Sequence, residues 1–310
     1  MSVQPTPAAQ PLPELLRALR AIAEPTRLRL LAVCRAGELT VGETVRIIGQ
    51  SQPRVSRHLK LLCDAGLLER FREGHWVFYR VPTRGREAQL ARAVLEQLSA
   101  DDETARLDRQ RMEEVMAERA RLASSYLATL RETAVPDEQV DSAIMRAVSD
   151  APLGDLLDIG TGTGRMLRLL AGRAEQATGV DISSEMLMIA RTNVHAAGLH
   201  HCTMRHGNMY KLPFGNSSFD TVTVDQVLSQ ADRPALVLTE AARTLRPGGS
   251  LLIVDFAAGG ENRIEADDLA PWLAAAGLGC VRVERVDSFR APSTILLLAH
   301  RAVGVGGVAA

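Results

Sequence analysis

The chain has 310 residues, of which 46% are hydrophobic and 24% are charged, and its formal net charge is −1. This length predicts two domains with a connector, and the composition is typical of a soluble globular protein and excludes a disordered chain. The near-zero net charge gives no whole-chain indication of nucleic-acid or membrane binding. The four cysteines form no CxxC pattern, and the start of the chain lacks the basic and apolar segments of a signal peptide. We therefore expect a cytoplasmic protein without a membrane span.

The spacing of apolar residues changes along the chain and divides it into parts. Apolar residues recur at helical spacing up to about residue 130, and strands alternate with helices from Leu153 onward. The sequence therefore predicts a disordered tail over 1–11, a first domain over 12–98, a helical linker over 99–150, a second domain over 151–302 and a disordered tail over 303–310.

The first domain is predicted to be a winged helix-turn-helix, mainly α with a β-hairpin as its wing. Ser51 is the N-cap candidate of the helix predicted over 51–66, and Gly66 ends that helix. Glu73-Gly74 is the expected turn of the hairpin. The expected elements are two or three helices over 12–39, a helix over 40–50, a helix over 51–66, a hairpin over 67–81 and a helix over 86–98.

A long helix rich in Glu and Arg is predicted from Asp101 to about Leu130. Asp102 and Arg106 stand at i,i+4 spacing, which is usual for a partly solvated helix. The apolar stripe fits packing on its own chain better than an interdomain or dimer contact. It consists of Met112, Val115, Met116, Leu122, Ala123, Tyr126 and Leu130.

The helix over 51–66 has the side chains of a DNA-recognition helix. Residues 24–81 contain ten Lys or Arg against six Asp or Glu, so the first domain is the basic one. Short polar and cationic side chains can contact base edges and phosphates, while Val55, Leu59 and Leu62 hold the helix to its domain. A solvated face that binds nothing is the disfavoured alternative. The candidate DNA-binding residues are Ser51, Gln52, Arg54, Ser56, Arg57, His58 and Lys60 on the helix, and Arg70, Arg72, His75 and Arg80 on the hairpin.

These segments resemble the arsenic-repressor (ArsR) type of bacterial regulators across roughly residues 12–98. The resemblance rests on "EPTRLRLL" and on "SQPRVSRHLKLLCDAGLLERFREGHWVFYRV". It implies a homodimer, formed through helices near 12–19 and 86–98, that binds double-stranded operator DNA as a repressor. Many members bind metals through cysteines at positions where this sequence has Thr40 and Gly42, so no metal site is expected there.

The second domain is predicted to be α/β, with a parallel sheet and helices on its faces. The expected strands are "DLLDI", "ATGVDI", "CTMRHG", "FDTVTVDQ", "LLIVDF", "VRVERV" and "TILLLAH". After the first strand, Asp158 is followed by Gly160, Gly162 and Gly164. The dinucleotide fingerprint would need a third glycine at Arg165, so a nicotinamide cofactor is disfavoured. Asp181, at the end of the next strand, lies where a carboxylate would bind a ribose diol.

This domain resembles the class I S-adenosylmethionine (SAM)-dependent methyltransferases over about 150–300. The resemblance implies a Rossmann-like seven-stranded sheet in the order 3-2-1-4-5-7-6 with the seventh strand antiparallel, and SAM or S-adenosylhomocysteine (SAH) as the ligand. Asn208 stands where the family has an acid. Asp225 is a weak catalytic candidate and is also among the implied cofactor-binding residues, which are Asp158, Gly160, Thr161, Gly162, Gly164, Asp181, Ile182, Met186, Asn208, Met209, Asp225 and Gln226.

A cluster of histidines with one cysteine follows in the same domain. Adjacent residues of the cluster point apart, and no HxxxH or CxxC spacing recurs, so a metal site is disfavoured against a solvated loop. The cluster consists of His195, His200, His201, Cys202 and His206.

The combined order resembles ArsR-type regulators that carry a fused methyltransferase domain. Two segments of this chain are shorter than the corresponding segments of those regulators: "SYLATLRETAVPDEQV" and "VDFAAGGENRIEADD". Both segments would border the substrate side of the pocket. The leading hypothesis is therefore a repressor whose second domain binds SAM or SAH as an effector. The alternative is an active methyltransferase, with a small-molecule or macromolecular acceptor and a DNA-binding domain for targeting or autoregulation. Arsenic methylation is remote, because only Cys202 and Cys280 lie in this domain.

Overall fold

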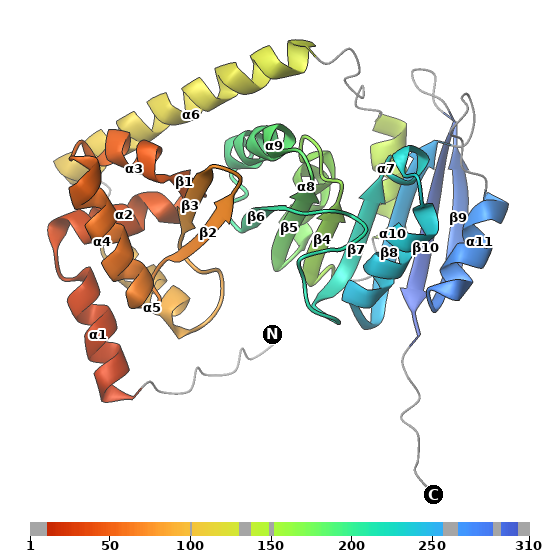
Figure 1. Ribbon diagram of the computed structural model, residues 1–310, viewed down its shortest axis with the longest axis horizontal. Coiled ribbons are helices and arrows are strands. Elements are labelled where there is room, and N and C mark those ends of the chain that lie inside the picture. Colours follow the sequence, from red (N-terminus) through yellow and green to blue (C-terminus); the bar gives the residue numbers. More distant parts are fainter. Residues whose placement is uncertain are drawn as a thin grey trace, which may run out of the picture. The chain divides into compact units, whose positions relative to one another are not determined.

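The computed structural model describes residues 11–99, 101–129, 138–148, 152–256, 266–287 and 293–302 (Figure 1). The chain divides into two compact units, Met1–Leu122 and Ala123–Ala310, so the boundary falls inside the predicted linker. The predicted tails lie outside the described residues except for Pro11. None of the helices in the described ranges is long and apolar enough to cross a membrane.

The first unit is a winged helix-turn-helix, as predicted. Its small sheet is antiparallel, in the order β1-β3-β2. The elements are α1 (Leu12–Ile22), α2 (Pro25–Arg35), β1 (Leu39–Thr40), α3 (Val41–Ile48), α4 (Gln52–Asp64), β2 (Glu69–Glu73), β3 (Trp76–Arg80), α5 (Arg86–Leu95) and α6 (Glu103–Thr129), which continues into the second unit.

The ends of α3 and α4 follow from their residues. Thr40 and Glu43 form a capping box at the start of α3, and Gly49, with φ of 73°, ends the helix in the left-handed conformation. Gly66, with φ of 74°, follows α4 in the same way. Ser51 is the N-cap residue of α4, but its side chain makes no capping hydrogen bond, and Pro53 lies in the first turn.

Two details of the wing differ from the prediction. Glu73 pairs with Trp76, so the turn is Gly74-His75 and not Glu73-Gly74. The prediction was wrong by one residue because hairpin register depends on cross-strand pairing, which residue types near a turn do not fix. Strand β1 was not predicted, because two residues are too few to show the alternation of apolar and polar side chains that indicates a strand.

The linker helix α6 packs on the first unit along part of its predicted stripe. Met112 and Val115 are buried in the same core as the helices of the winged domain. Leu122 is 57% exposed, so it does not belong to that packed face. Leu130 lies outside the described residues.

The second unit has the predicted seven-stranded sheet. Its order is β6-β5-β4-β7-β8-β10-β9, and β10 is antiparallel to both neighbours, which is the predicted 3-2-1-4-5-7-6 arrangement. The strands are β4 (Asp155–Ile159), β5 (Gln176–Asp181), β6 (Cys202–His206), β7 (Phe219–Asp225), β8 (Leu245–Phe256), β9 (Leu278–Val286) and β10 (Thr294–Arg301).

Helices cover both faces of this sheet (Figure 1). One core contains residues of α7, α8 and α9, and the other contains residues of α10 and α11. This layering places the carboxyl ends of β4, β5 and β7 at one edge, where α/β sheets bind ligands. The helices are α7 (Glu138–Ala147), α8 (Arg165–Leu170), η1 (Ala171–Arg173), α9 (Ser184–Ala196), η2 (Leu228–Gln230), α10 (Pro234–Thr244) and α11 (Ala266–Ala275).

Candidate functional site

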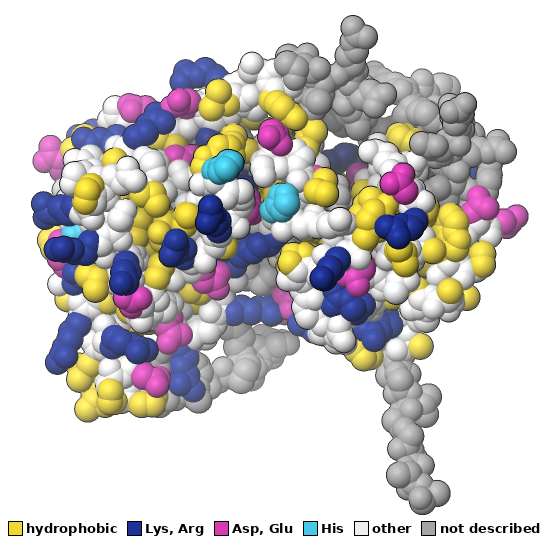
Figure 2. Space-filling model, viewed as in Figure 1, with side chains coloured by type: hydrophobic (Ala, Val, Ile, Leu, Met, Phe, Trp, Pro, Cys, Tyr) yellow, Lys and Arg dark blue, Asp and Glu magenta, His cyan; other side chains and the backbone are white. Residues whose placement is uncertain are grey.

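The predicted DNA-binding face of α4 is mostly open to solvent. Val55, Leu59 and Leu62 are fully buried, as the stripe requires, and they fix which side of the helix faces outward. The exposed candidates are Ser51, Gln52, Arg54, Arg57 and Lys60, while Ser56 is partly buried. Figure 2 shows Lys and Arg side chains spread over the part of the first unit where α4 lies.

His58 differs from the other candidates on α4. Its side chain is only 12% exposed, and its Nδ1 lies 3.6 Å from Glu24 Oε2. In this conformation the imidazole faces its own domain and not a ligand. His58 is therefore not among the exposed DNA-binding candidates of α4.

The wing adds a second set of cations. Arg70, Arg72 and His75 are exposed, as a contact with phosphates requires. Arg80 is instead half-buried and is held by Glu69, with an Nη2 to Oε2 distance of 2.6 Å. Trp76, beside the turn, is 44% exposed and was not among the predicted residues.

The second candidate site lies where β4 ends. Asp158, the penultimate residue of β4, is fully buried, and its two carboxylate oxygens accept hydrogen bonds from the hydroxyls of Thr161 and Thr223, both at 2.7 Å. Asp158 of β4 therefore connects β4 to β7 and to the glycine loop through these two hydrogen bonds. Gly179, which pairs with Asp158 across the sheet, leaves room for the Thr161 side chain: a Cβ there would lie 2.7 Å from the Thr161 hydroxyl oxygen.

The three glycines of the loop all have positive φ, which other residues rarely adopt. A Cβ on Gly160 would come within 2.3 Å of Val227, and one on Gly164 would lie 3.3 Å from Ala190. A Cβ on Gly162 would meet only the carbonyl oxygen of Gly160, at 3.9 Å. The loop is thus packed on two sides and open above Gly162.

Asp181 connects the loop to the next helix. Its carboxylate accepts hydrogen bonds from the backbone N–H of Gly162 at 2.9 Å and of Ser183 at 2.9 Å. Gly207, after β6, donates its N–H to the Asp181 carbonyl at 3.0 Å. The structure therefore brings together three segments that the resemblance assigned to one nucleoside site.

The candidates for the adenine side have mixed surroundings. Ile182 is 65% exposed beside Asp181, which leaves an apolar surface available for a ligand. Met186 and Met209 are half-buried. Asn208 is exposed, and its side-chain oxygen accepts a hydrogen bond from the Tyr210 N–H at 2.8 Å. Contact of these residues with a ligand stays a prediction.

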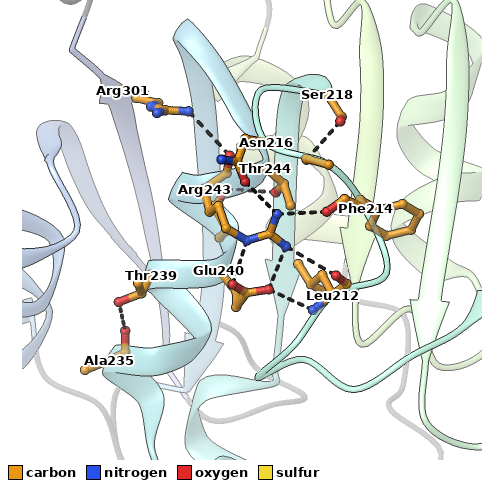
Figure 3. Close-up of polar contacts among 12 residues, drawn as sticks. Leu212, Phe214, Asn216, Ser218, Ala235, Thr239, Glu240, Arg243, Thr244 and Arg301 are labelled. Carbon is orange, nitrogen blue, oxygen red and sulfur yellow. Dashed lines mark hydrogen bonds and ion pairs between the residues drawn. The ribbon is translucent and has the colours of Figure 1, made fainter.

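An arginine in α10 fixes the segment that follows Asn208 (Figure 3). Arg243 donates hydrogen bonds to the backbone oxygens of Leu212 and Phe214, at 3.2 and 2.8 Å, and to Glu240. Glu240 in turn accepts from the Leu212 N–H at 2.7 Å. This network holds the loop between β6 and β7 against α10.

Asp225 and Gln226 lie at the end of β7. Arg165, the first residue of α8, donates to Asp225 Oδ2 at 2.7 Å and also forms an ion pair with Asp141 of α7. Gln226 has φ of 55°, a strained conformation for a residue that is not glycine, and such outliers cluster at functional sites. The sequence had marked Asp225 and Gln226, but neither Arg165 nor Asp141. The only feature of the sequence that could have indicated a role for Arg165 is its position directly after the glycine loop.

The histidine-rich segment shows no arrangement for a metal. Among the described residues there is no group of three or more His, Cys, Asp or Glu side chains that could hold a metal ion. His195 and His200 lie edge to face with ring centroids 5.6 Å apart, and His201 contacts the carbonyl of Ala171.

The fold and these two sites define a winged-helix DNA-binding domain joined to a methyltransferase-type α/β domain. Residues 24–70 match the arsR family of bacterial regulatory proteins, and residues 157–253 match the methyltransferase domain family. The chain therefore carries an arsR-family helix-turn-helix segment followed by a methyltransferase-domain segment.

Individual relatives match the second domain. A demethylmenaquinone methyltransferase of Listeria welshimeri is 38% identical over 104 residues, which is 33% of this chain and 44% of the relative. A phosphatidylethanolamine N-methyltransferase of Cereibacter sphaeroides is 38% identical over 103 residues, 33% of this chain and 50% of the relative. The chain thus spans about half the length of these curated relatives. A SAM-dependent methyltransferase structure from Aquifex aeolicus has a TM-score of 0.45 at 20% identity, covering 52% of this chain and 88% of that one.

Two glycine substitutions separate the packing of the loop from its binding surface. We expect Gly160→Ala to destabilise the protein by several kcal/mol, on the order of other overpacked or strained sites, because its methyl group would overlap Val227. Gly162→Ala is expected to cost only about 1 kcal/mol, from its positive φ, and yet to lose SAM binding, because its methyl group enters the open space above the loop. Thermal unfolding and calorimetric SAM titration measure both. Equal unfolding temperatures for the two variants would contradict this packing.

The stability of the protein should depend on the ionisation of Asp158. Burial raises the pKa of this carboxyl from 3.8 to about 7, against the lowering effect of the Thr161 and Thr223 hydrogen bonds. Between these two pH values the folded protein binds the additional proton, so its free energy of unfolding falls as pH rises, by up to about 1.4 kcal/mol per unit, and levels off above about 7.

Asp158→Asn lacks this titration. We expect the stability of the variant relative to wild type to increase as pH rises across this window, as measured by thermal unfolding of both proteins in matched buffers. Taking the difference cancels the other titrating groups. A constant or decreasing difference would show that burial does not raise this pKa.

Proposed function

We propose that the protein is a DNA-binding regulator whose second domain transfers the methyl group of SAM to a small-molecule acceptor. The observation that carries this proposal is the glycine loop, in which Gly162 is open above and its N–H is fixed by Asp181. The names of the similar proteins support it, since the relatives compared are methyltransferases. Cytoplasmic location remains part of the proposal.

The residues of this edge of the sheet fit a nucleoside with an amino-acid end. Asp181 would hold the ribose hydroxyls, Ile182 offers an apolar surface to the adenine, and the space above Gly162 admits the backbone of the ligand. When bound, SAM supplies an electrophilic methyl group on a sulfonium. The same residues would also hold SAH, which lacks that group.

Methyl transfer asks more for positioning and exclusion of water than for a strong acid or base. Asp225, at the end of β7, is the residue that would orient a nucleophile. Its Oδ2 is already bound by Arg165, so it is better suited to orient than to remove protons. Parts of the two segments that we expect to border the substrate side of the pocket, residues 130–137 and 257–265, lie outside the described residues.

Turnover separates an enzyme from a ligand-binding protein. Full-length protein incubated with methyl-labelled SAM and the small-molecule fraction of a cell extract should yield labelled product. Gly162→Ala should lose this activity, and Glu114→Gln, an exposed change on α6, should keep it. Absence of label above the Gly162→Ala background, in protein that binds SAM, would reject catalysis on small molecules.

A second candidate function is a regulator whose operator affinity responds to SAM or SAH. The observation that favours it is the attachment of α6, the helix that leads into the second unit, to helix α3 of the helix-turn-helix. Arg119 of α6 is buried, forms an ion pair with Glu43, the capping residue of α3, and donates to the Glu38 carbonyl at 3.0 Å. Burial raises the pKa of Glu43, but the charge and hydrogen bonds of Arg119 outweigh it and hold the pKa below its ordinary value.

The other end of α3 is held in the same way. Arg111 of α6 donates to the Ile47 carbonyl at 3.2 Å. Asp108 of α6 accepts two hydrogen bonds from Arg29, which also donates to the Ile48 carbonyl at 2.9 Å. A displacement of α6 would therefore move α3 and the turn before the recognition helix as one body, because both ends of α3 are bound.

A homodimer is part of this second function. Leu12, Leu16 and Leu19 form an exposed apolar stripe at i, i+4, i+7 on α1, with exposures of 67%, 38% and 40%. This is the helix that the ArsR resemblance assigns to the dimer interface. An apolar stripe in contact with water is expected to be covered by a partner, and a twofold dimer would suit palindromic operator DNA.

Operator binding with and without nucleoside tests the second function. With DNA selected from a random library, we expect SAM or SAH to change the Kd of the wild type by about 5- to 150-fold, the usual range of coupling. The double variant Glu43→Gln with Arg119→Gln should keep its ligand-free Kd within about threefold and lose most of this change, while Glu114→Gln should behave as wild type. Identical wild-type isotherms with and without each nucleoside would reject an effector role.

A further inference from the structure

A buried carboxylate at the end of β8 holds the turn that follows β7. Asp255 is 1% exposed, and its Oδ2 accepts hydrogen bonds from the N–H groups of Leu228 and Ser229, at 2.9 and 3.2 Å. Its Oδ1 accepts a hydrogen bond from the N–H of Phe256, at 2.8 Å. The first N–H groups of a helical turn such as η2 have no acceptor within the turn. Asp255 therefore binds the start of η2 to the end of β8, although Leu228 precedes it by 27 residues.

The same end of β8 also binds the residue at which the chain turns. The Gln226 N–H donates to the Val254 carbonyl at 2.7 Å, and the Gln230 side chain donates to the Gln226 carbonyl at 2.8 Å. Gln226 has a φ of 55°, and a residue with a side chain keeps such a conformation only where its surroundings fix it. Residues 226–230 therefore form a turn of fixed shape, which is attached to β8 through Val254 and Asp255.

Val227 is the residue of this turn that reaches the glycine loop. It is 8% exposed, and a Cβ on Gly160 would lie 2.3 Å from its Cγ2, so the valine methyl group fills the space beside that glycine. On the β5 side, the Val180 carbonyl accepts hydrogen bonds from the N–H groups of Gly160 and Thr161, at 2.8 and 3.0 Å. The loop is thus held between β5 and the turn, and a displaced turn would change the position of Gly160.

We propose that Asp255 is a positioning residue of the nucleoside site, which it shapes through the turn and Val227 and not by touching the ligand. This rests on the proposed function, because the loop that Val227 contacts is the loop assigned to SAM. Gly162, the open position of that loop, follows Gly160 by two residues, so a shift of Val227 would be transmitted to the surface that meets the ligand. Binding sites lose affinity when the residues behind them no longer fix their positions.

Amide hydrogen exchange, followed by NMR, tests this link in the wild-type full-length protein. Coupling between two sites is reciprocal, so SAH bound at the loop should in turn protect the N–H groups of Leu228 and Ser229. The matched control is the N–H of Asp155, which donates to the Asp220 carboxylate at 2.8 Å at the opposite end of the same sheet. We expect saturation with SAH to slow exchange at Leu228 and Ser229 by about fivefold more than at Asp155. Equal slowing at all three would overturn the proposal, because it would report only a general stabilisation.

Affinity measurements on variants test the residue itself. Asp255→Asn replaces one acceptor oxygen by an NH2 group that cannot accept. We expect this change to weaken SAH binding by about tenfold in calorimetric titration, as for outer contacts that orient metal ligands. Val227→Ala leaves the carboxylate in place and should weaken binding by a similar factor, because it removes the contact with Gly160. The double variant should bind about as weakly as the weaker single variant, because both changes act on one contact. Factors that multiply in the double variant would overturn the proposed route through Val227.

Thr221→Val is the matched control for a loss of stability. Thr221 lies near the start of β7, is 4% exposed, and its hydroxyl donates to the Leu153 carbonyl at 2.9 Å. The variant loses a buried hydrogen bond at the end of β7 that is remote from the loop, so its unfolding temperature should fall while its SAH affinity stays that of the wild type. All titrations are made well below the unfolding temperature of each variant. An equal loss of affinity in Thr221→Val and Asp255→Asn would overturn the proposal.

The remaining outcomes separate this inference from the proposed function. A wild type that binds SAH, together with Asp255→Asn that binds it equally well, rejects only the role of Asp255. If Asp255→Asn does not fold, the exchange of the Leu228 and Ser229 N–H groups in the wild type decides. A wild type that binds neither SAM nor SAH rejects the nucleoside site itself, and the inference with it.

Discussion

The proposed nucleoside site depends on one buried carboxylate. Asp158 accepts hydrogen bonds from Thr161 in the glycine loop and from Thr223 in β7, so a single side chain joins two strands and the loop. Gly179, which has no side chain, leaves the space that the Thr161 side chain occupies in this arrangement. Burial makes the ionised form of Asp158 costly, which is typical of groups retained at functional sites.

A different kind of constraint organises the first unit. Helix α3 is bound at both ends. Residues of α6 hold it through the ion pair of Arg119 with Glu43 and the hydrogen bond of Arg111 to the Ile47 carbonyl. Arg29 of α2, which pairs with Asp108 of α6, donates to the Ile48 carbonyl. Breaking one partner of a buried pair leaves an uncompensated charge, so this contact resists independent motion of α3 and α6. The recognition helix α4 follows α3 directly, and the sensor hypothesis rests on this physical continuity, whereas the enzyme hypothesis rests on the glycine loop and on the methyltransferases that the second domain matches.

Much of the fold followed from the sequence. Apolar periodicity predicted the helices of the winged domain and the seven strands, and the buried stripe of Val55, Leu59 and Leu62 lies as predicted. Periodicity works here because it records which side of an element meets a core. It gave the wrong turn in the wing and placed Leu122 in a packed face, since register and the end of a contact surface depend on the partner element.

By itself the sequence determined the two domains, the residue types of the recognition helix and the positions of Asp158, Asp181 and the loop glycines, because these are properties of local order and spacing. Only the tertiary structure decided that His58 faces Glu24, that Arg165 lies between Asp141 and Asp225, and that one oxygen of Asp225 accepts no hydrogen bond from the part of the chain that the structure describes. These facts join residues 24 or more positions apart, and such contacts arise when separate strands and helices pack, which spacing along one chain does not encode.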